Sequence, residues 1–348
     1  MKRHLFFALL AYAFCLSVTA QKKLLVYAVG FYNQENLFDT CHDAGKRDYD
    51  FLPDGSYHWD GLKYSHKLKN MSRALADMGT DLLPNVGCAF IGLSEVENSR
   101  VLTDLCAQEP LKNRNMQYCH IEGPDKRGID CALLYNPALF TVEEVKLHPY
   151  VTELPKDSNF VTRGFLAVKG RLADEPVVAI VAHLPSRFST SYYRELGGKQ
   201  IRAIKDSLLR ENPKYKIFVM GDMNDDPSDK SMVESLGARA DKNNVANGEM
   251  YSPWINIHKQ GTGTLFYNGS WNLFDQIIMT PNLLMSSDAD NADAGMLKYR
   301  KAQIFRRDYL IQSTGKYKGA PKRTTAGGIW LDGYSDHLPV VVYLSKQK

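Results

Sequence analysis

The sequence lacks the cysteine patterns that bind metal ions or cross-link small secreted domains. Five of its six cysteines follow residue 20, and no two of them are spaced as Cys-x-x-Cys. They stand at Cys41, Cys88, Cys106, Cys119 and Cys131. A thiolate metal site is therefore not expected, because such sites use paired cysteines. The odd number gives no disulfide framework, although an exported location would permit a disulfide.

A large charge excess, internal repeats and low-complexity linkers are also missing. The 43 Lys and Arg residues against 39 Asp and Glu residues leave a net charge of only +4. This balance excludes a chain coated with positive charge, but a local basic rim can still steer a phosphate substrate. The composition, 44% hydrophobic and 24% charged, is that of a globular protein with a sizeable core. We predict one catalytic domain over residues 21–348 and a monomer.

The one long apolar run lies at the N-terminus. Lys2 and Arg3 precede an apolar stretch at residues 5–16, and the small-residue pattern Val18-Thr19-Ala20 follows it. This layout predicts a cleaved signal peptide over residues 1–20, and hence a periplasmic or secreted protein. The run is too short to span a bilayer, so no stable membrane insertion is expected. A retained anchor is the alternative; the bulky residue before Cys15 argues against lipoprotein processing.

Strands outnumber helices among the elements that the sequence predicts. Apolar and β-branched runs predict strands at residues 23–31, 88–93, 131–135, 165–172, 177–184, 215–220, 274–279 and 340–344. The turn "ADEP" joins two of these runs into a hairpin over residues 165–184. Leu68, Met71 and Leu75 recur at helical spacing within a predicted helix over residues 64–78, and a second helix is predicted over 191–209. Because the apolar runs are continuous, we expect sheets that are covered on both faces.

Polar side chains gather where six of the predicted strands begin or end. The clusters are Asn33, Glu35 and Asn36; Glu95 and Glu97; His183, Ser186 and Arg187; Asp222, Asn224, Asp225 and Asp226; Asp275; and Asp336 with His337. Each cluster alone can be a turn or a cap, since Gly, Asn, Asp and Pro are the usual turn residues. Six of them are harder to explain in that way. Sheets bring strand ends to a common edge, so we expect these groups to meet in space.

The residue types in these clusters suit chemistry on a phosphate ester. Oxygen ligands without paired cysteines favour Mg²⁺, with Mn²⁺ or Ca²⁺ possible, over zinc. Histidine, asparagine and arginine side chains can donate hydrogen bonds to a phosphate, and Arg187 can do so with two bonds. A carboxylate such as Asp275 can orient the imidazole of His337. Together these features predict metal-assisted hydrolysis of a phosphate ester.

The ordered motifs resemble an exported bacterial branch of the endonuclease/exonuclease/phosphatase superfamily, whose fold is that of deoxyribonuclease I. They read "FYNQENLFD", "GLSEVEN", "RGIDCALLY", "AHLPSR", "GDMNDDP", "FDQII" and "GYSDHLP" and cover nearly all of the chain after residue 20. The resemblance implies an α/β fold, a four-layer α/β/β/α sandwich of two packed, mostly antiparallel sheets flanked by helices. It places the active site at one end of the two sheets.

The resemblance also implies roles for the metal-binding side of the site. Glu95 matches the principal metal ligand, and Asn33 matches an asparagine that supports the metal and the phosphate. Glu35 stands where some members carry an acid that binds or supports the metal. Asp336 matches the aspartate on the metal side of the closing motif. We therefore expect Glu35, Glu95 and Asp336 to bind the metal.

Further positions match the catalytic and phosphate-binding residues of the superfamily. Asp222 matches the aspartate that activates the water, and His337 matches the catalytic histidine that Asp275 orients. His183 contacts the phosphate in this pattern, and Asn224 holds the substrate. Two further residues, Arg127 and Arg187, suit phosphate binding but could equally be rim residues. Glu97, Asp225 and Asp226 are interpreted as loop residues.

These features predict a divalent-metal-dependent hydrolase of phosphate esters. The expected substrate is nucleic acid, cleaved by a secreted endonuclease that acts as a phosphodiesterase. Basic stretches at residues 192–210, which include Arg194, Lys199 and Lys205, and at 299–323 could grip a polyanion, or could be a solvated surface. The alternative is a phosphatase or phosphodiesterase of small-molecule or lipid phosphates. A non-catalytic binding module is disfavoured, because every core position of the motif set is filled.

Overall fold

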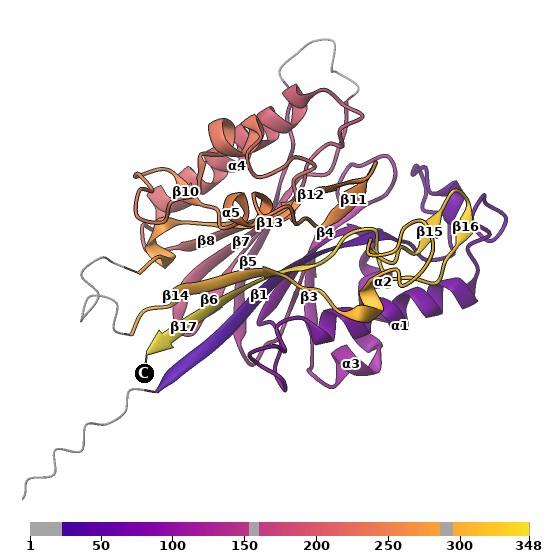
Figure 1. The fold of residues 1–348 in the computed structure, drawn as a ribbon, viewed down its shortest axis with the longest axis horizontal. Helices are drawn as coiled ribbons and strands as arrows, with labels where there is room; N and C mark the ends of the chain where they lie inside the picture. The colour runs from indigo at the N-terminus through magenta and orange to yellow at the C-terminus, as the bar shows by residue number, and fades with distance from the viewer. Residues whose placement is uncertain (1–22, 153–159, 286–294, 348) are drawn as a thin grey trace, which may run out of the picture.

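Four layers make up the part of the chain that the structure, a computed structural model, describes: residues 23–152, 160–285 and 295–347. Helices α1 to α3 cover one face of a first sheet, a second sheet packs on its other face, and α4 and α5 cover that second sheet (Figure 1). The expected α/β/β/α sandwich is confirmed. The signal peptide predicted over residues 1–20 lies outside the described residues.

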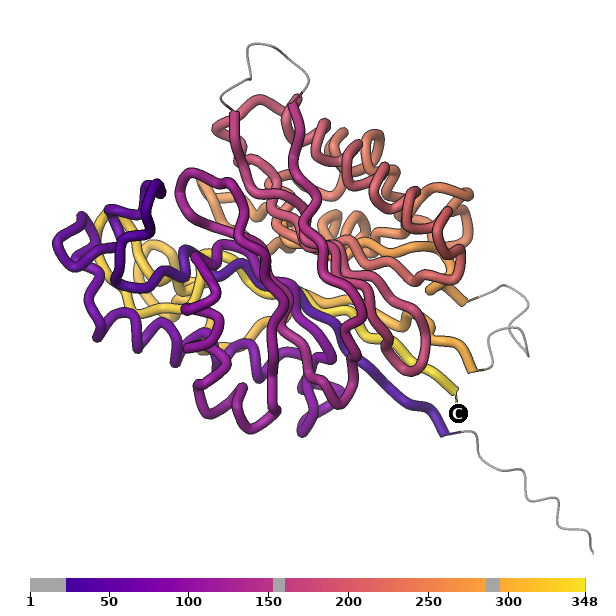
Figure 2. Tube along the Cα trace, turned by 180° about the vertical axis from the view of Figure 1, so that it is seen from behind, coloured from indigo at the N-terminus to yellow at the C-terminus, as the bar shows by residue number. Residues whose placement is uncertain are grey.

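The first sheet has the strand order β14-β17-β1-β2-β4-β3. Its strands are β1 (Leu24–Leu37), β2 (Phe90–Val96), β3 (Gln117–His120), β4 (Asp130–Tyr135), β14 (Lys298–Ile304) and β17 (Val340–Gln347). All neighbours are antiparallel except β1 and β2. Figure 2 shows the two ends of the described chain side by side, because the last strand, β17, pairs with the first, β1.

The second sheet has the order β5-β6-β7-β8-β13-β10-β9. Its strands are β5 (Phe140–His148), β6 (Phe165–Leu172), β7 (Glu175–His183), β8 (Lys216–Asp222), β9 (Ala238–Arg239), β10 (Met250–Tyr251) and β13 (Asp275–Met279). The β7–β8 and β9–β10 pairs are parallel and the others are antiparallel. Two small hairpins, β11 (Leu265–Tyr267) with β12 (Ser270–Asn272) and β15 (Thr325–Ala326) with β16 (Ile329–Trp330), complete the strands.

Alternation along β1 explains how one strand serves two cores. Val29 and Phe31 lie in the cluster between the sheets, whereas Ala28 and Tyr32 contact the helical layer. Successive side chains of a strand point to opposite faces, so an uninterrupted apolar run fills both cores. Every residue of β8 is buried for the same reason.

The helices form where apolar residues recur at three- and four-residue spacing. They are α1 (Gly61–Asp77), α2 (Ser99–Ala107), α3 (Glu109–Lys112), α4 (Ser191–Glu211) and α5 (Trp254–His258), with short turns at Tyr49–Phe51, Ser231–Leu236, Pro281–Leu283 and Asp308–Leu310. The side chain of Asp60 caps α1 by accepting a hydrogen bond from the Lys63 amide. Leu68, Met71 and Leu75 are buried against the first sheet, as the spacing predicts.

Several elements escape prediction because they are partly exposed or short. Strands β5 and β14 are edge strands of their sheets, and each mixes buried or half-buried residues with exposed, charged ones. Such strands lack the continuous apolar run that marks a central strand. Strand β14 also takes the first part of the basic stretch 299–323 into the first sheet.

Strand direction sets the edge on which the polar clusters meet. The parallel pairs bring the C-terminal ends of β1 and β2, and of β7 and β8, to the same side. Because β13 and β17 run antiparallel to their neighbours, they begin on that side, where Asp275 lies opposite Asp222 and Asp222 opposite His183. The hairpins β11–β12 and β15–β16 also lie toward this end (Figure 1). We call it the catalytic edge.

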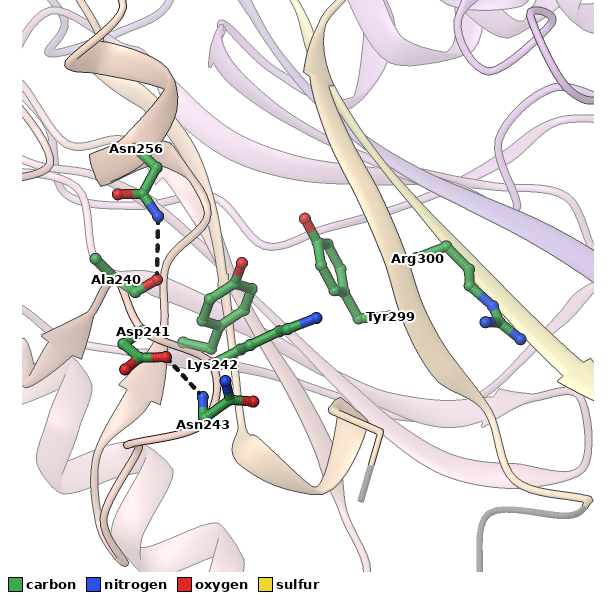
Figure 3. Close-up of a pocket in the computed structure, with 8 residues that line it drawn as sticks. Ala240, Asp241, Lys242, Asn243, Asn256, Tyr299 and Arg300 are labelled. Carbon is green, nitrogen blue, oxygen red and sulfur yellow. Dashed lines mark hydrogen bonds between the residues drawn. The ribbon is translucent and has the colours of Figure 1, made fainter. Parts of the chain in front are cut away.

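A cavity of about 500 Å³ lies away from the catalytic edge, between β10 and β14 (Figure 3). Tyr251 and Tyr299 line it, together with Lys242 and Arg300. Tyr299 pairs with residue 344 of β17 and Tyr251 with residue 279 of β13, so both lie at the far ends of strands that begin at the catalytic edge. This cavity is therefore separate from the clustered strand ends.

Helix α4 does not present the exposed basic surface that its sequence suggested, because two of its cations are buried. Arg194 is buried, with its Nε 2.8 Å from Asp225 Oδ1, and its Nη1 donates to the carbonyls of Ser186 and Ser189. Lys205 is also buried, and it donates to the carbonyl of residue 248. These two buried cations contact other parts of the protein and are not accessible to a polyanion, whereas Lys199 is exposed.

The Arg194 pair predicts a large stability difference between two changes in one helix. Arg194→Met should cost about 3–5 kcal/mol of unfolding free energy, because it leaves the buried Asp225 with only the longer 3.4 Å contact to the half-exposed Arg187. Lys199→Met, at an exposed position of the same helix, should change stability by less than about 0.5 kcal/mol. Urea denaturation of both variants measures the difference. Equal, small effects would show that the buried pair contributes little.

Candidate active site

An amide joins the two principal acids of the catalytic edge. Asn33 Nδ2 donates to Asp222 Oδ2 at 3.0 Å and lies 3.4 Å from Glu95 Oε1. Its Oδ1 accepts the Glu35 backbone N–H at 2.8 Å, which fixes the orientation of the amide. Asn33 and Asp222 are buried, so the three side chains sit in a desolvated and ordered group. This group lies at the ends of β1, β2 and β8.

Left-handed backbone conformations aim these side chains. Glu35, Asn36, Glu95 and Asn224 have φ values of 45°, 56°, 60° and 49°. Residues other than glycine rarely adopt positive φ, and such residues cluster at functional sites. The bends create local bonds: Asn36 N donates to Glu95 Oε2, and Asn224 N donates to Asp222 Oδ1, both at 2.9 Å. Each strand thus turns just where its carboxylate is needed.

Two histidines face Asp222, one from β7 of the second sheet and one from the segment that precedes β17 of the first sheet. His183 Nε2 lies 3.6 Å from Asp222 Oδ2 and 3.9 Å from Glu95 Oε1. His337 Nε2 lies 3.8 Å from Asp222 Oδ2, and its Nδ1 lies 2.6 Å from Asp275 Oδ2. Asp275 is fully buried beneath the ring. The carboxylate therefore orients the imidazole with Nε2 toward the centre of the site.

The environments of the two histidines separate their protonation states. Burial alone would lower the pKa of His337, but Asp275, Asp222 and Asp336 raise it well above its usual value. Burial, Arg163 and Arg127 lower the pKa of His183 well below its usual value. Burial raises the pKa of Asp222 to about 7, although His337 opposes the shift. At neutral pH the site thus offers a cationic and a neutral imidazole.

The side chains of this site fit a divalent cation. Glu95, His183 and Asp222 each present a ligand atom, and these atoms lie within 4.8 Å of one another. Carboxylate oxygens with one imidazole nitrogen suit the borderline and hard cations. Asp222, Asp275 and His337 form a second such group, but there the Nδ1 of the histidine is already bound to Asp275. The first group is therefore the better candidate for holding a metal.

Glu35 and Asp336, both expected to bind metal, make other contacts. Glu35 accepts the amides of Thr324 at 2.6 Å and Thr325 at 3.3 Å, and burial raises its pKa to about 7. Asp336 Oδ2 accepts from Arg323 at 2.9 Å, while its Oδ1 lies 3.9 Å from His337 Nε2. Among the described residues, neither joins a group of converging ligand atoms. Their metal role stays a prediction.

Besides Asn33, three residues were expected to bind the substrate or its phosphate, and they differ in how many protein contacts hold their side chains. Arg127 is exposed and donates to Asn36, close enough to His183 to depress the pKa of that ring. Asn224 Nδ2 donates to the carbonyl of residue 184. Arg187 is held by Asp226 at 3.0 Å and by Asp229 at 2.8 Å. Arg127 is thus the arginine best placed for a phosphate, and Arg187 ties loops together.

Two buried cations support the site and were not predicted. Arg163 donates to the carbonyls of residues 183 and 184 at 2.9 and 3.0 Å and pairs with Asp125 at 3.1 Å. Lys67 of α1 donates to Thr324 Oγ1 and to the carbonyl of Tyr334. Nothing in the sequence around Arg163 marks it. Lys67, however, is a charged residue four positions before Met71 on the apolar face of a helix, and this could have identified it.

A comparison with protein families identifies the fold and its chemistry. The model of the endonuclease/exonuclease/phosphatase family matches residues 28–346. The chain belongs to this family. Its members are hydrolases of phosphate esters that depend on divalent metal ions, and this chain is such an enzyme. The resemblance to the superfamily is confirmed, whereas assignment to an exported branch stays a prediction.

Solved structures share the fold at low sequence identity. An endonuclease/exonuclease/phosphatase family protein from Bacteroides thetaiotaomicron has a TM-score of 0.56 at 13% identity, over 94% of this chain and 97% of that one. A mannosyl-6-phosphatase from the same organism has 0.54 at 14%, over 91% and 99%. TDP2 from D. rerio, complexed with single strand DNA product, has 0.52 at 13%, over 92% and 98%. No curated protein sequence matches the chain significantly.

The comparisons leave the substrate open. At these identities the structural likeness shows the fold alone, and one fold can carry many functions.

None of the helices in the described ranges is long and apolar enough to cross a membrane.

The Asp275–His337 pair predicts a pH-dependent effect in metal-free protein. Asp275→Asn should lower the pKa of the His337 imidazole, which NMR titration of the ring measures directly. Because the native pKa is raised, the stability that the pair contributes is fully present below about pH 6.5 and is lost as pH rises through the native pKa. The variant should therefore be destabilised more in acid than in alkali.

A matched control removes an exposed carboxylate elsewhere. Asp174 lies in the turn between β6 and β7, at the end of β7 opposite His183. Asp174→Asn should leave the titration of His337 unchanged. An unchanged midpoint in Asp275→Asn would mean that Asp275 does not stabilise the imidazolium.

Proposed function

We propose that this enzyme is an exported, Mg²⁺-dependent phosphodiesterase that cleaves nucleic acid. The site chemistry supports a phosphate ester, and a basic flank beside the site supports a polyanion. The signal-like residues 1–20 support export, and the oxygen-rich ligand set supports Mg²⁺.

The constellation around Asp222 supports an in-line attack of water on phosphorus. A divalent cation held at this site would supply positive charge that stabilises the transition state as the bond from phosphorus to the leaving oxygen breaks. Asp222 Oδ2, held by Asn33, accepts a proton from the attacking water. The cationic His337 donates from Nε2 to a phosphoryl oxygen, where charge develops in the transition state. Glu95 and His183, whose ligand atoms lie beside Asp222, would hold the metal.

The observation that carries the nucleic-acid assignment is a set of exposed cations in the segment 306–323, one of which contacts the site. This basic flank consists of Arg306, Lys316, Lys318 and Arg323. Arg323 contacts Asp336, next to His337. Arg306 donates a hydrogen bond to the carbonyl of residue 319, which brings it close to the segment that carries Lys316 and Lys318. A polymer of phosphates that is bound at the site is long enough to contact several of these cations, whereas a small phosphate ester is not.

Charge reversal on the basic flank tests the polyanion. For single-stranded DNA, log KM should rise steeply with log salt, because each neutralised phosphate releases about 0.7 counterion. Lys316→Glu/Lys318→Glu should raise KM at low salt and reduce this slope by about 0.7 for each phosphate that the variant no longer neutralises. A small chromogenic phosphodiester should show neither effect. Steady-state kinetics between low and physiological salt provide both measurements.

The control is Lys199→Glu, which reverses an exposed charge on α4 and should leave the slope unchanged. A chelator should abolish hydrolysis of every substrate, and Mg²⁺ should restore it. Rapid release of phosphate from monoesters, with DNA left intact at low salt, would instead assign the enzyme to the small-phosphate alternative. In that case the site would stand, and the basic flank would be a solvated surface.

A further inference from the structure

An aromatic ring stands fully exposed on the loop that follows His183. The Phe188 side chain is 102% exposed, the largest value among the exposed large apolar residues of the described chain. The loop runs from the end of β7, at His183, to the start of α4. Single exposed apolar side chains are common on protein surfaces, so the exposure alone decides nothing. What matters is how the loop is held.

Two arginines fix the loop on both sides of Phe188. Arg194 donates to the carbonyl of Ser186 at 3.0 Å and to that of Ser189 at 3.1 Å, which brackets the ring in sequence. Arg187, the preceding residue, is pinned by the carboxylates of Asp226 and Asp229. Ordering a loop costs conformational entropy, and here the buried Arg194–Asp225 pair and the partly exposed pairs of Arg187 offset that cost. The ring is therefore presented on a preorganised support.

A second exposed ring stands on the hairpin beside His337. Tyr267 is 61% exposed at the tip of β11–β12. The Asn268-Gly269 turn, with φ values of 50° and 82°, closes this hairpin in the tight form that such dipeptides favour. Leu265, two residues earlier, forms a β-bridge with His337. The backbone pairing of residue 265 with His337 therefore places the hairpin that carries Tyr267 next to His337.

Arg187 connects the two aromatic-bearing elements. Its Nη1 donates to Asn272 Oδ1 at 3.1 Å, and Asn272 pairs with Leu265 across the hairpin. The same arginine therefore positions the loop of Phe188 and the hairpin of Tyr267. Because one support follows His183 and the other pairs with His337, both rings are held relative to the reacting phosphate.

The rings suit planar partners better than an apolar surface. Phe188 lies between Arg187 and Ser189, and Tyr267 is the exposed end of the short run Leu265–Tyr267, whose other two side chains are half-buried. Neither ring therefore belongs to a long exposed apolar run. A bilayer or a protein partner needs a contiguous apolar patch. Isolated rings beside a phosphate-binding site are the arrangement that stacks on successive bases of a single strand. In a duplex the bases already stack on one another.

We propose that Phe188 and Tyr267 stack on unpaired bases that flank the scissile phosphate, so that the substrate is single-stranded nucleic acid. This inference rests on the proposed nucleic-acid phosphodiesterase activity and names the form of its substrate. Arg187 acts as the positioning residue that keeps both rings in place.

Three oligonucleotides of equal length separate stacking from charge. The first is a single strand with bases, the second a single strand of abasic residues, and the third the base-paired duplex. All carry the phosphodiester backbone, but only the first offers unpaired bases. In Mg²⁺, the native enzyme should have a KM for the base-bearing strand that is at least about fivefold lower than for the other two.

Removing either ring should abolish this preference. Phe188→Ser and Tyr267→Ser should each raise KM for the base-bearing strand at least about fivefold, and should leave KM for the abasic strand and kcat nearly unchanged. Leu24→Ser is the matched control, because Leu24 is 49% exposed at the end of β1 that lies away from the catalytic edge. It should behave as the native protein does.

The outcomes distinguish this inference from the function on which it rests. If both ring variants cleave the base-bearing strand with the native KM, or if the native enzyme prefers the duplex, the inference is wrong and the nuclease assignment stands. If the native enzyme cleaves none of the oligonucleotides but hydrolyses a monoester, both are wrong. Loss of binding to phospholipid vesicles in the ring variants, with unchanged strand cleavage, would show that the rings contact a lipid surface instead.

Discussion

The hydrogen bond from Asn33 to Asp222 crosses from one sheet of the sandwich to the other, and the catalytic edge depends on it. Asn33 lies near the C-terminal end of β1, an inner strand of the first sheet, and Asp222 ends β8, the central strand of the second. The bond forms only if β1 and β8 keep their pairing registers within their sheets. A shift of one residue in either strand would turn the side chain of Asn33 or Asp222 toward the opposite face of its sheet. The large apolar cluster between the sheets maintains that register. Packing far from the chemistry therefore decides whether the acids and histidines meet.

Gathering charges at this edge carries a cost in stability that a second set of buried charges offsets. Burial raises the pKa of Glu35 and that of Asp222 to about 7, which means that the fold disfavours their ionised forms. Lys67 lies close enough to Glu35 to oppose that shift, and burial lowers its own pKa to about 8. Arg163 holds the backbone at His183. Charges held in this way exert strong electrostatic effects on a substrate, because little water competes with them.

The sequence was sufficient to predict the sandwich and the edge, because both follow from local patterns. Continuous apolar runs mark the central strands, and polar clusters at their ends mark the edge. The sequence did not reveal which charged side chains pair with other residues of the protein and are therefore not available to a ligand. Arg187 was expected to bind phosphate and Arg194 stands in a basic stretch, yet both bind acids of the 225–229 loop. Such pairings depend on contacts between residues 30 or more positions apart. Glu35 likewise binds the amides of residues 324 and 325, which no local pattern indicates.

The central claim is that Asp222 and His337 act together on one phosphate, and a double-mutant cycle tests it most directly. Asp222→Asn, His337→Ala and the double variant would be compared with the native enzyme by kcat for a small phosphodiester in Mg²⁺, with unfolding free energies measured on the same preparations. The account predicts that each single change lowers kcat by about 10² or more while the protein stays folded. It also predicts that the double variant loses far less than the product of the single losses, because the two groups serve one transition state. Single variants that keep native turnover per folded molecule would contradict the account.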